Sequence, residues 1–211
     1  MSSDVRDRPY VHIVDDDESL RHVIVRLLRS VGVEGRAYGS TDEFLSVQRC
    51  DAPGCILLDV RLPGMGGLEF QAQLSALGIR LPVVLMTGHG DISMSVRAMK
   101  AGAVDFLSKP FRDQDMIDAV GCAICRDRDR RAAEAVIAHI RARFSQLSAR
   151  EQQVMELATT GRMNKQIAGD LGISEVTVKI HRGAAMRKME ARTIVDLVRM
   201  SDAIKSEVRP N

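Results

Sequence analysis

The sequence VHIVDDD at residues 11–17 decides how the N-terminal half of the chain folds. A short, mostly apolar run leads here directly into three aspartates. Further apolar runs follow at residues 55–58, 82–86 and 104–107, with a weak one at 35–38 and helix-like segments between them; the only charges within these runs are Arg36 and Asp105. Continuous apolar runs of four or five residues are typical of strands buried on both faces of a sheet. The order predicts an α/β unit with a doubly wound, five-stranded parallel sheet and helices on both faces.

The carboxyl ends of these predicted strands carry the polar residues. They are Asp15-Asp16-Asp17, Asp59, Thr87 and Lys109. Because parallel strands end at one edge of a sheet, we expect these side chains to converge there. Crowded carboxylates repel one another unless a positive charge lies among them, and carboxylates with water suit Mg²⁺. The cofactor predicted from this edge is therefore Mg²⁺.

A metal ion, an ammonium group and a hydroxyl group at one edge suit a phosphoryl group, because the two cations neutralise its oxygens during transfer. Asp59 ends the third strand, apart from the acidic run, and is the best-placed nucleophile. A covalent aspartyl phosphate is known carboxylate chemistry. Taken singly, an aspartate at a strand end is usually a helix cap, and Asp17 is a candidate for that role before a helix that begins at Glu18.

Four segments at this edge resemble the receiver domain of two-component response regulators, a flavodoxin-like fold. They are residues 14–17, 58–64, 86–91 and 106–111, and the last two are most similar to the FixJ subfamily. The resemblance spans about residues 9–125. It implies that Asp59 accepts the phosphoryl group. It also implies that Asp15 and Asp16, with Asp59 and the backbone carbonyl of Arg61, hold Mg²⁺.

The resemblance also assigns the switch residues. It implies that the Thr87 hydroxyl turns toward the phosphoryl group and that Lys109 pairs with it. Phe106 resembles the aromatic side chain that turns inward as Thr87 moves, and the bond before Pro110 is expected to be cis. His89, between two glycines, is a weaker candidate for a phosphorylated or metal-binding histidine, since no second histidine is near.

The charged stretch RDRDRR at residues 126–131 separates the two halves. It has neither Pro nor Gly, which predicts a solvated helix rather than a flexible tether. Ile137, Ile140 and Phe144 recur beyond it at helical spacing. This apolar stripe packs either against a partner copy or on its own domain. We therefore predict a receiver domain at 1–125, a helical linker at 126–145 and a second domain at 146–211.

The second domain is predicted to be all α-helical. Ser148 and Glu151 form a capping box that opens a helix through Thr160. Two further helices are expected at 164–171 and 174–189, with a fourth at 193–200. A short helix, a glycine-containing turn and then a basic helix is the order of a helix-turn-helix.

The basic helix carries a face suited to DNA. Val176, Ile180, Gly183 and Arg187 share one side, opposite a predicted core side that holds His181. Apolar side chains can contact thymine methyl groups, and Lys or Arg can reach guanine or phosphate; a merely solvated basic face is the alternative. The expected DNA-binding residues are Asn164, Lys165, Thr177, Lys179, Ile180, Arg182, Gly183 and Arg187.

This domain resembles the LuxR/FixJ-type helix-turn-helix over about residues 145–205. The likeness is carried by residues 148–154, 164–168 and 177–181. It implies base contacts at Lys179, Ile180 and Gly183 and backbone contacts at Asn164 and Lys165. Gly183 departs from the polar or basic residue that the family usually has there.

The composition of the chain indicates the compartment in which the protein works. Residues 1–144 hold 19 basic and 20 acidic residues, and residues 145–211 hold 11 and 8. No apolar run approaches the ~20 residues that span a bilayer, and the polar start does not suit a signal peptide, so we expect a cytoplasmic protein without a membrane partner.

Cys122 and Cys125 form a C-x-x-C motif. This motif is either a redox or zinc-binding element, or the two cysteines are simply small buried side chains on a helix.

The combined expectation is a transcriptional response regulator rather than an enzyme. A sensor histidine kinase would phosphorylate Asp59, and phosphorylation would favour a homodimer that binds promoter DNA; RNA polymerase is a further candidate partner. Three alternatives stay open. They are a phosphatase with its nucleophile at the first strand, a regulator that works without phosphorylation, and a redox switch through Cys122 and Cys125.

Overall fold

The computed structural model describes residues 8–47, 51–88 and 92–206 of the chain. Contacts divide the chain into two compact units, one ending at Arg131 and one beginning at Ala132. The domain boundaries predicted at 125 and 145 stay predictions.

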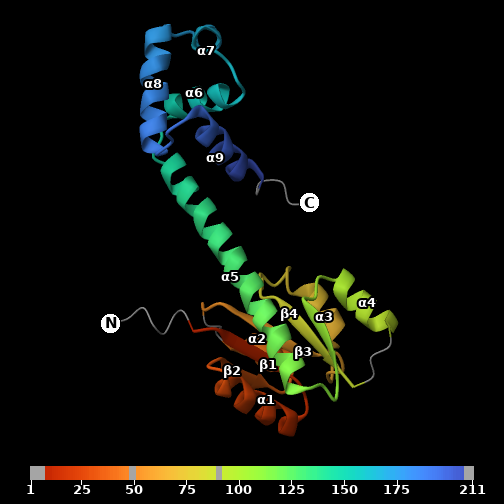
Figure 1. Ribbon diagram of the computed structural model, residues 1–211. Helices are drawn as coiled ribbons and strands as arrows, with labels where there is room; N and C mark the ends of the chain where they lie inside the picture. Colours follow the sequence, from red (N-terminus) through yellow and green to blue (C-terminus); the bar gives the residue numbers. More distant parts are fainter. Residues whose placement is uncertain (1–7, 48–50, 89–91, 207–211) are drawn as a thin grey trace. The chain divides into compact units, whose positions relative to one another are not determined.

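The first unit contains the predicted parallel sheet (Figure 1). Its strands are β1 (Tyr10–Val14), β2 (Glu34–Tyr38), β3 (Gly54–Asp59), β4 (Val83–Thr87) and β5 (Asp105–Ser108). Their order is β2-β1-β3-β4-β5, and every neighbouring pair is parallel. This confirms the five-stranded doubly wound fold.

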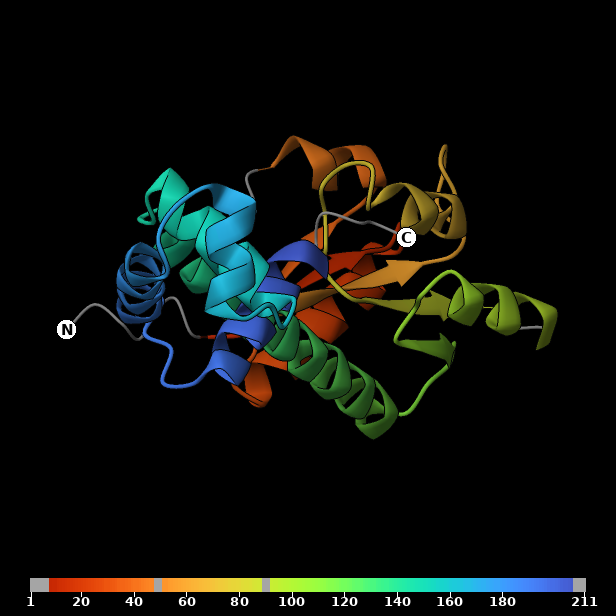
Figure 2. The same ribbon diagram turned by 90° about the horizontal axis from the view of Figure 1, so that it is seen from above.

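Helices cover both faces of this sheet, as Figure 2 shows from above. They are α1 (Glu18–Ser30), α2 (Thr41–Ser46), α3 (Gly67–Gln73), α4 (Ile92–Lys100) and the first part of α5 (Asp113–Phe144). Successive strand residues alternate between faces, so Leu57 packs in a core with α1 and α5, whereas Leu58 packs in a second core with α2, α3 and α4. Two buried cores fix the strands between them and hold the strand ends in register.

Helix α5 is longer than the sequence predicted. It runs without a break for 32 residues and joins the expected helix at 113–125 to the expected linker. The prediction of a fully solvated charged stretch was wrong at one residue, because Asp127 is 0% exposed. Alternating charges gave no sign that one carboxylate would face the sheet. Ile140 and Phe144, from the predicted apolar stripe, pack into the core of the second unit.

The second unit is all α-helical beyond α5, as predicted, with α6 (Ala149–Thr159), α7 (Asn164–Leu171), α8 (Glu175–Lys188) and α9 (Ile194–Ser206). The capping box is present, since Ser148 Oγ accepts the Glu151 N–H at 3.3 Å and Glu151 Oε2 accepts the Ser148 N–H at 2.7 Å. Lys188 Nζ reaches the same Glu151 oxygen at 2.6 Å, which ties the end of α8 to the start of α6. Gly172 ends α7 in the left-handed region, with φ +64°.

The two cysteines of the C-x-x-C motif are not the small buried side chains that one interpretation of the sequence predicted. Cys122 and Cys125 are free and exposed rather than buried, whereas Cys55 is buried in β3. Across the described ranges, none of the helices combines the length and apolar character that a bilayer crossing requires.

Candidate functional site

The structure brings the predicted strand-end residues to one edge of the first unit. Asp15 follows β1, Asp59 ends β3, Thr87 ends β4 and Lys109 follows β5. Lys109 Nζ lies 2.5 Å from Asp15 Oδ2 and 3.0 Å from Asp59 Oδ2. One ammonium group therefore bridges carboxylates that lie 44 positions apart in the chain and meet only because the strands are parallel neighbours.

Three carboxylates at this edge could hold a metal ion. One oxygen each of Asp15, Asp16 and Asp59 lies within 4.8 Å of the others. Asp15 is 0% exposed and Asp59 is 6% exposed, whereas Asp16 faces solvent. An all-oxygen set of anionic ligands, open to water on one side, fits a hard divalent cation that keeps part of its hydration shell. The residues present therefore fit Mg²⁺.

Burial and the ammonium group set the charge balance of this cluster. Burial raises the pKa of Asp15, and hydrogen bonds from Lys109 and from the Asp17 backbone only partly offset this. Burial lowers the pKa of Lys109, but its hydrogen bonds to Asp15 and Asp59 outweigh burial and leave that pKa above its ordinary value. Lys109 is thus held as a cation against the two buried carboxyl groups.

The backbone around Asp59 is closely packed against α3. The Arg61 N–H donates to Asp59 Oδ1 at 3.3 Å. A Cβ atom on Gly67 would lie 2.1 Å from the Asp59 carbonyl oxygen, so only glycine fits there. Sequence reasoning missed Gly67, although a glycine pair just before a helix is a recognisable signal of close backbone approach. The expected role of the Arg61 carbonyl as a metal ligand stays a prediction.

The remaining predicted switch residues are also positioned at this edge. Thr87 is 0% exposed, and its carbonyl accepts the Lys109 N–H at 2.7 Å. Phe106 is half-buried and packs against the core that contains Leu58. The Lys109–Pro110 bond is cis, as the family resemblance implied.

Two weaker candidates have different outcomes. Asp17 caps α1, since its Oδ1 accepts the Leu20 N–H at 3.1 Å, which confirms the helix-cap interpretation. His89 lies outside the described residues.

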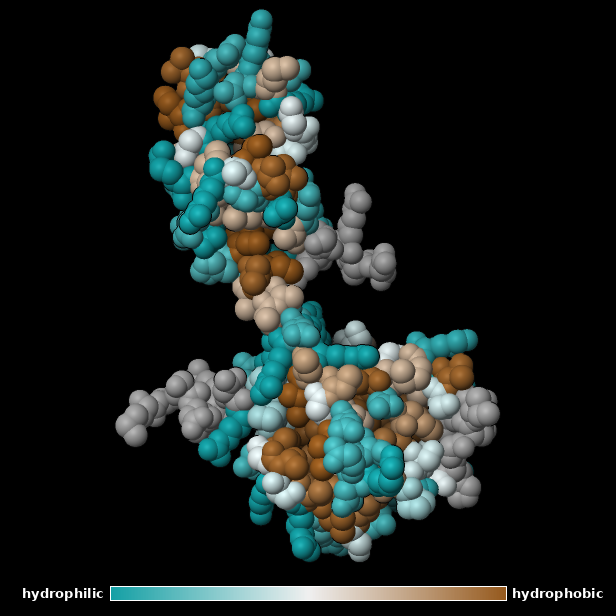
Figure 3. Space-filling view, in the orientation of Figure 1, coloured by the Kyte–Doolittle hydropathy of each residue, from teal (hydrophilic) through white to brown (hydrophobic). Residues whose placement is uncertain are grey.

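A second candidate surface lies on α8 and α7 in the second unit. Val176 and Ile180 are 66% and 64% exposed, and Lys179 beside them also faces solvent. Figure 3 shows hydrophobic surface over the part of α8 near α7. The core side of α8 holds Val178 and Ala185, which are both 0% exposed. A helix that buries one side and exposes large apolar and basic residues on the other can contact both base edges and phosphates.

The other residues predicted to bind DNA have mixed environments. Asn164 is half-buried and its Oδ1 accepts Arg182 Nη1 at 3.0 Å, which joins α7 to α8. Thr177 Oγ1 lies 2.8 Å from Ser174 Oγ at the start of α8. Gly183 is half-buried, with Arg187 Nη1 3.7 Å from the position that a Cβ atom would occupy. Lys165 and Arg187 are exposed, and His181 is half-buried.

Comparisons with known proteins show the family to which each part of the chain is similar. A model of the response regulator receiver domain matches residues 11–121, and a model of the luxR family of bacterial regulatory proteins matches residues 145–201. Nodulation protein W of Bradyrhizobium diazoefficiens is 54% identical over 194 residues, which cover 92% of this chain and 86% of that protein. The transcriptional regulatory protein FixJ of Azorhizobium caulinodans is 42% identical over 191 residues, 90% of each chain. The solved structure of the response regulator StyR is 46% identical, with a TM-score of 0.80 and coverage of 92% of this chain and 98% of that one.

Proposed function

Because this chain belongs to the response regulators, with a receiver domain followed by a LuxR-type DNA-binding domain, we propose that phosphorylation of Asp59 by a sensor histidine kinase controls its binding to promoter DNA. The observation that carries this proposal is the position of Lys109 Nζ, 2.5 Å from Asp15 and 3.0 Å from Asp59 at the acidic edge of the sheet. A cation held there can pair with phosphoryl oxygens as they arrive.

The transfer step needs one anionic oxygen on the protein. A carboxylate oxygen of Asp59 forms the new P–O bond while the P–N bond to the kinase histidine breaks, and the electron pair of that bond stays on the imidazole nitrogen. Asp15, Asp16 and Asp59 would hold Mg²⁺, which when bound neutralises charge on the transferring group. Asp59 suits the nucleophile better than Asp15, because Asp15 is 0% exposed whereas Asp59 is 6% exposed at the open edge of the sheet.

Side chains beside Asp59 would then change position in response to the phosphoryl group. Lys109 can turn from the two carboxylates toward the phosphoryl oxygens, and the Thr87 hydroxyl can donate to another of them. Movement of Thr87 at the end of β4 leaves space beside β5, into which Phe106 turns. These steps change the face formed by α4, β5 and α5, which we propose as the surface of a phosphorylation-dependent homodimer.

The kinase requires a docking surface beside Asp59. A groove next to Lys109 is lined on one side by Leu20, Val23 and Leu27 of α1 and on the other by Phe111. Val23 is 55% exposed. An exposed valine among half-buried apolar residues, in a groove that Lys109 also lines, suits a partner helix that presents its own apolar stripe. We propose that the kinase helix carrying the phosphohistidine docks in this groove.

The output step follows from the helix-turn-helix. Two copies would place two α8 helices in successive major grooves, ~34 Å apart. Pairing raises the overall affinity, since the second domain binds from a high effective concentration. Such a regulator works in the cytoplasm and requires no enzymatic turnover, and RNA polymerase is its further candidate partner at the promoter.

One experiment tests the switch and the DNA site together. The full chain is incubated with a random-site DNA library, with and without a small-molecule phosphodonor, in Mg²⁺ or in EDTA. We expect selection of a two-fold symmetric sequence only when phosphodonor and Mg²⁺ are both present. Equal enrichment under all conditions would exclude phosphorylation as the switch. Sustained hydrolysis of a phosphomonoester would instead favour the phosphatase alternative.

The exposed side of α8 gives a further prediction. Lys179→Ala should weaken binding to the selected DNA by about 1–3 kcal/mol if Lys179 contacts a base, and should relax selectivity at that base pair. The matched control is Lys205→Ala, which removes the same charge from an exposed residue of α9. Both variants are titrated against the site by fluorescence anisotropy. Equal losses for the two variants would mean that Lys179 contributes only general charge.

A further inference from the structure

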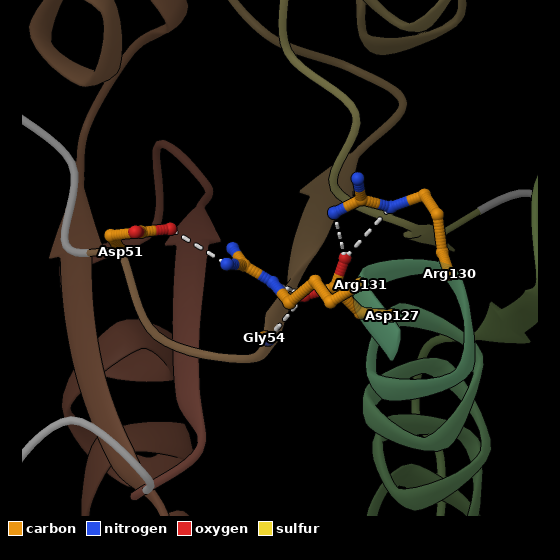
Figure 4. Close-up of polar contacts among 5 residues, drawn as sticks. All are labelled: Asp51, Gly54, Asp127, Arg130 and Arg131. Atoms are coloured by element: carbon orange, nitrogen blue, oxygen red, sulfur yellow. Dashed lines mark hydrogen bonds and ion pairs between the residues drawn. The ribbon is translucent and has the colours of Figure 1, made fainter. Parts of the chain in front are cut away.

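A buried carboxylate lies at the edge of the sheet opposite the phosphoryl-transfer site. Asp127 of α5 is 0% exposed, and its Oδ2 accepts the backbone N–H of Gly54 at 3.0 Å (Figure 4). Gly54 is the first residue of β3, and Asp59 is the last. The strand that carries the phosphoryl acceptor is therefore attached at its other end to α5.

Two arginines complete the coordination of Asp127. Arg130 donates to Oδ1 from Nη2 at 2.5 Å and from Nε at 3.2 Å. Arg131 donates from Nε to Oδ2 at 2.7 Å and from Nη1 to Asp51 Oδ1 at 2.7 Å. Figure 4 shows these side chains converging between α5 and the segment that precedes β3. We call Asp51, Gly54, Asp127, Arg130 and Arg131 the α5 clamp.

The attachment point on β3 is rigid. A Cβ atom on Gly54 would lie 2.0 Å from the carbonyl oxygen of Tyr10 in β1, so no other residue fits without moving a strand. The clamp thus bonds to the backbone at a place where β3 is tightly packed against β1, rather than to a side chain that can change rotamer. Any sliding or rotation of α5 at Asp127 would break this bond.

The charge of Asp127 favours a positional role over a purely stabilising one. A buried carboxylate is costly to desolvate, and a buried ion pair often stabilises a fold no more than apolar residues would. Its bonds are directional, however, and they hold only one placement of the helix. Arg126, Arg128 and Asp129 on the same turns are exposed. Within residues 126–131, Asp127 alone is buried, so the clamp holds the last turns of α5 before the second unit begins at Ala132.

We propose that Asp127 is a positioning residue for the phosphorylation response. Its bond to β3 holds the far turns of α5 in place, so that a change at the Asp59 edge alters the first turns of the helix, and the face that they form with α4 and β5, instead of being lost in a movement of the whole helix. Helix α5 begins at Asp113, four residues after Lys109, so a movement of Lys109 at the phosphoryl-transfer edge reaches the first turn of the helix directly. With Asp127 bonded to β3, the helix cannot relieve that change by sliding along the sheet. This inference rests on the proposed function, because it requires that phosphorylation alters DNA binding.

The test compares Asp127→Asn with Asp129→Asn in the full chain. Both substitutions remove one negative charge from α5, but Asp129 is exposed and outside the clamp. For each protein, DNA affinity is measured with and without phosphodonor and Mg²⁺, alongside labelling of Asp59 and amide exchange at Gly54. We expect Asp127→Asn to be labelled fully, to exchange faster at Gly54, and to lose about five-fold or more of the affinity ratio between the two states. Asp129→Asn should match the wild type.

Each other outcome has a separate meaning. An unchanged affinity ratio in Asp127→Asn, with wild-type labelling, overturns the positioning role alone. Reduced labelling also overturns it, since Asp127 would then act on the phosphoryl site. A wild type that does not respond to phosphorylation overturns the proposed function and this inference with it. If Asp127→Asn fails to fold, the double variant Arg130→Gln and Arg131→Gln removes both ion-pair partners that hold the Asp127 carboxylate against the Gly54 N–H, together with the link to Asp51. A wild-type affinity ratio in that double variant overturns the inference.

Discussion

Asp59→Asn should abolish phosphorylation of the protein by a small-molecule phosphodonor. The asparagine side chain has nearly the same shape, but it has no anionic oxygen to form the P–O bond. The fold should survive, because asparagine fills the same buried space as Asp59 and Lys109 keeps its 2.5 Å contact with Asp15. Labelling is measured by intact-protein mass spectrometry after incubation with the phosphodonor and Mg²⁺.

The matched control is Asp42→Asn, which makes the same change at an exposed aspartate of α2. It should be labelled at the wild-type level. Label retained at full stoichiometry by Asp59→Asn would move the acceptor to another side chain and remove the central step of the proposed function. Label lost by both variants would point to a general effect of charge. The DNA-affinity ratio between the two states should fall to one in Asp59→Asn only.

Gly67→Ala should strongly destabilise the first unit and impair labelling at Asp59. The added Cβ would lie 2.1 Å from the Asp59 carbonyl oxygen and 3.0 Å from the Val60 Cα. Both neighbours are backbone atoms, so relief requires that α3 or the end of β3 moves. The Gly67 N–H also donates to the Val60 carbonyl at 3.0 Å, which such a movement would lengthen. We expect the free energy of unfolding to fall by about 3 kcal/mol, at the upper end of overpacking costs.

Gly121→Ala is the matched control, because a Cβ atom at Gly121 in α5 meets no other atom within 4 Å. Alanine there should raise the free energy of unfolding by up to about 1 kcal/mol through its higher helix propensity. Urea denaturation of both variants measures these changes in the free energy of unfolding, which should have opposite signs. A loss of less than about 1 kcal/mol in Gly67→Ala would mean that the end of β3 yields easily, contrary to its buried packing. Labelling rates then report whether the Asp59 backbone has moved.

The repeated apolar runs and the residues that end them were sufficient to predict the sheet. Strands buried on both faces leave a strong pattern, and parallel connections allow few topologies, so the edge shared by Asp15, Asp59, Thr87 and Lys109 followed. The capping box at Ser148 and the glycine that ends the short helix at 164–171 were equally local signals. The structure confirms these elements because each depends on neighbours in the chain or on a short period.

Other features depend on which residues meet across the fold. Nothing in the charged run at 126–131 marks Asp127 rather than Asp129, because both share the same local pattern and only the placement of α5 buries one of them. Gly54 and Gly67 are glycines for the same kind of reason, since the atoms that exclude a side chain come from Tyr10 and Asp59. The exposure of Cys122 and Cys125 was likewise decided by which side of α5 faces the sheet.

By itself, the sequence determined the two kinds of folded unit and the identities of the residues at the acidic edge, because hydrophobic periodicity and strand-end chemistry are properties of short segments. Only the tertiary structure decided the distances at that edge, the close approaches at Gly54 and Gly67, and the burial of Asp127. Those depend on packing between segments far apart in the chain, where a shift of one helical turn leaves the local pattern unchanged but alters every contact.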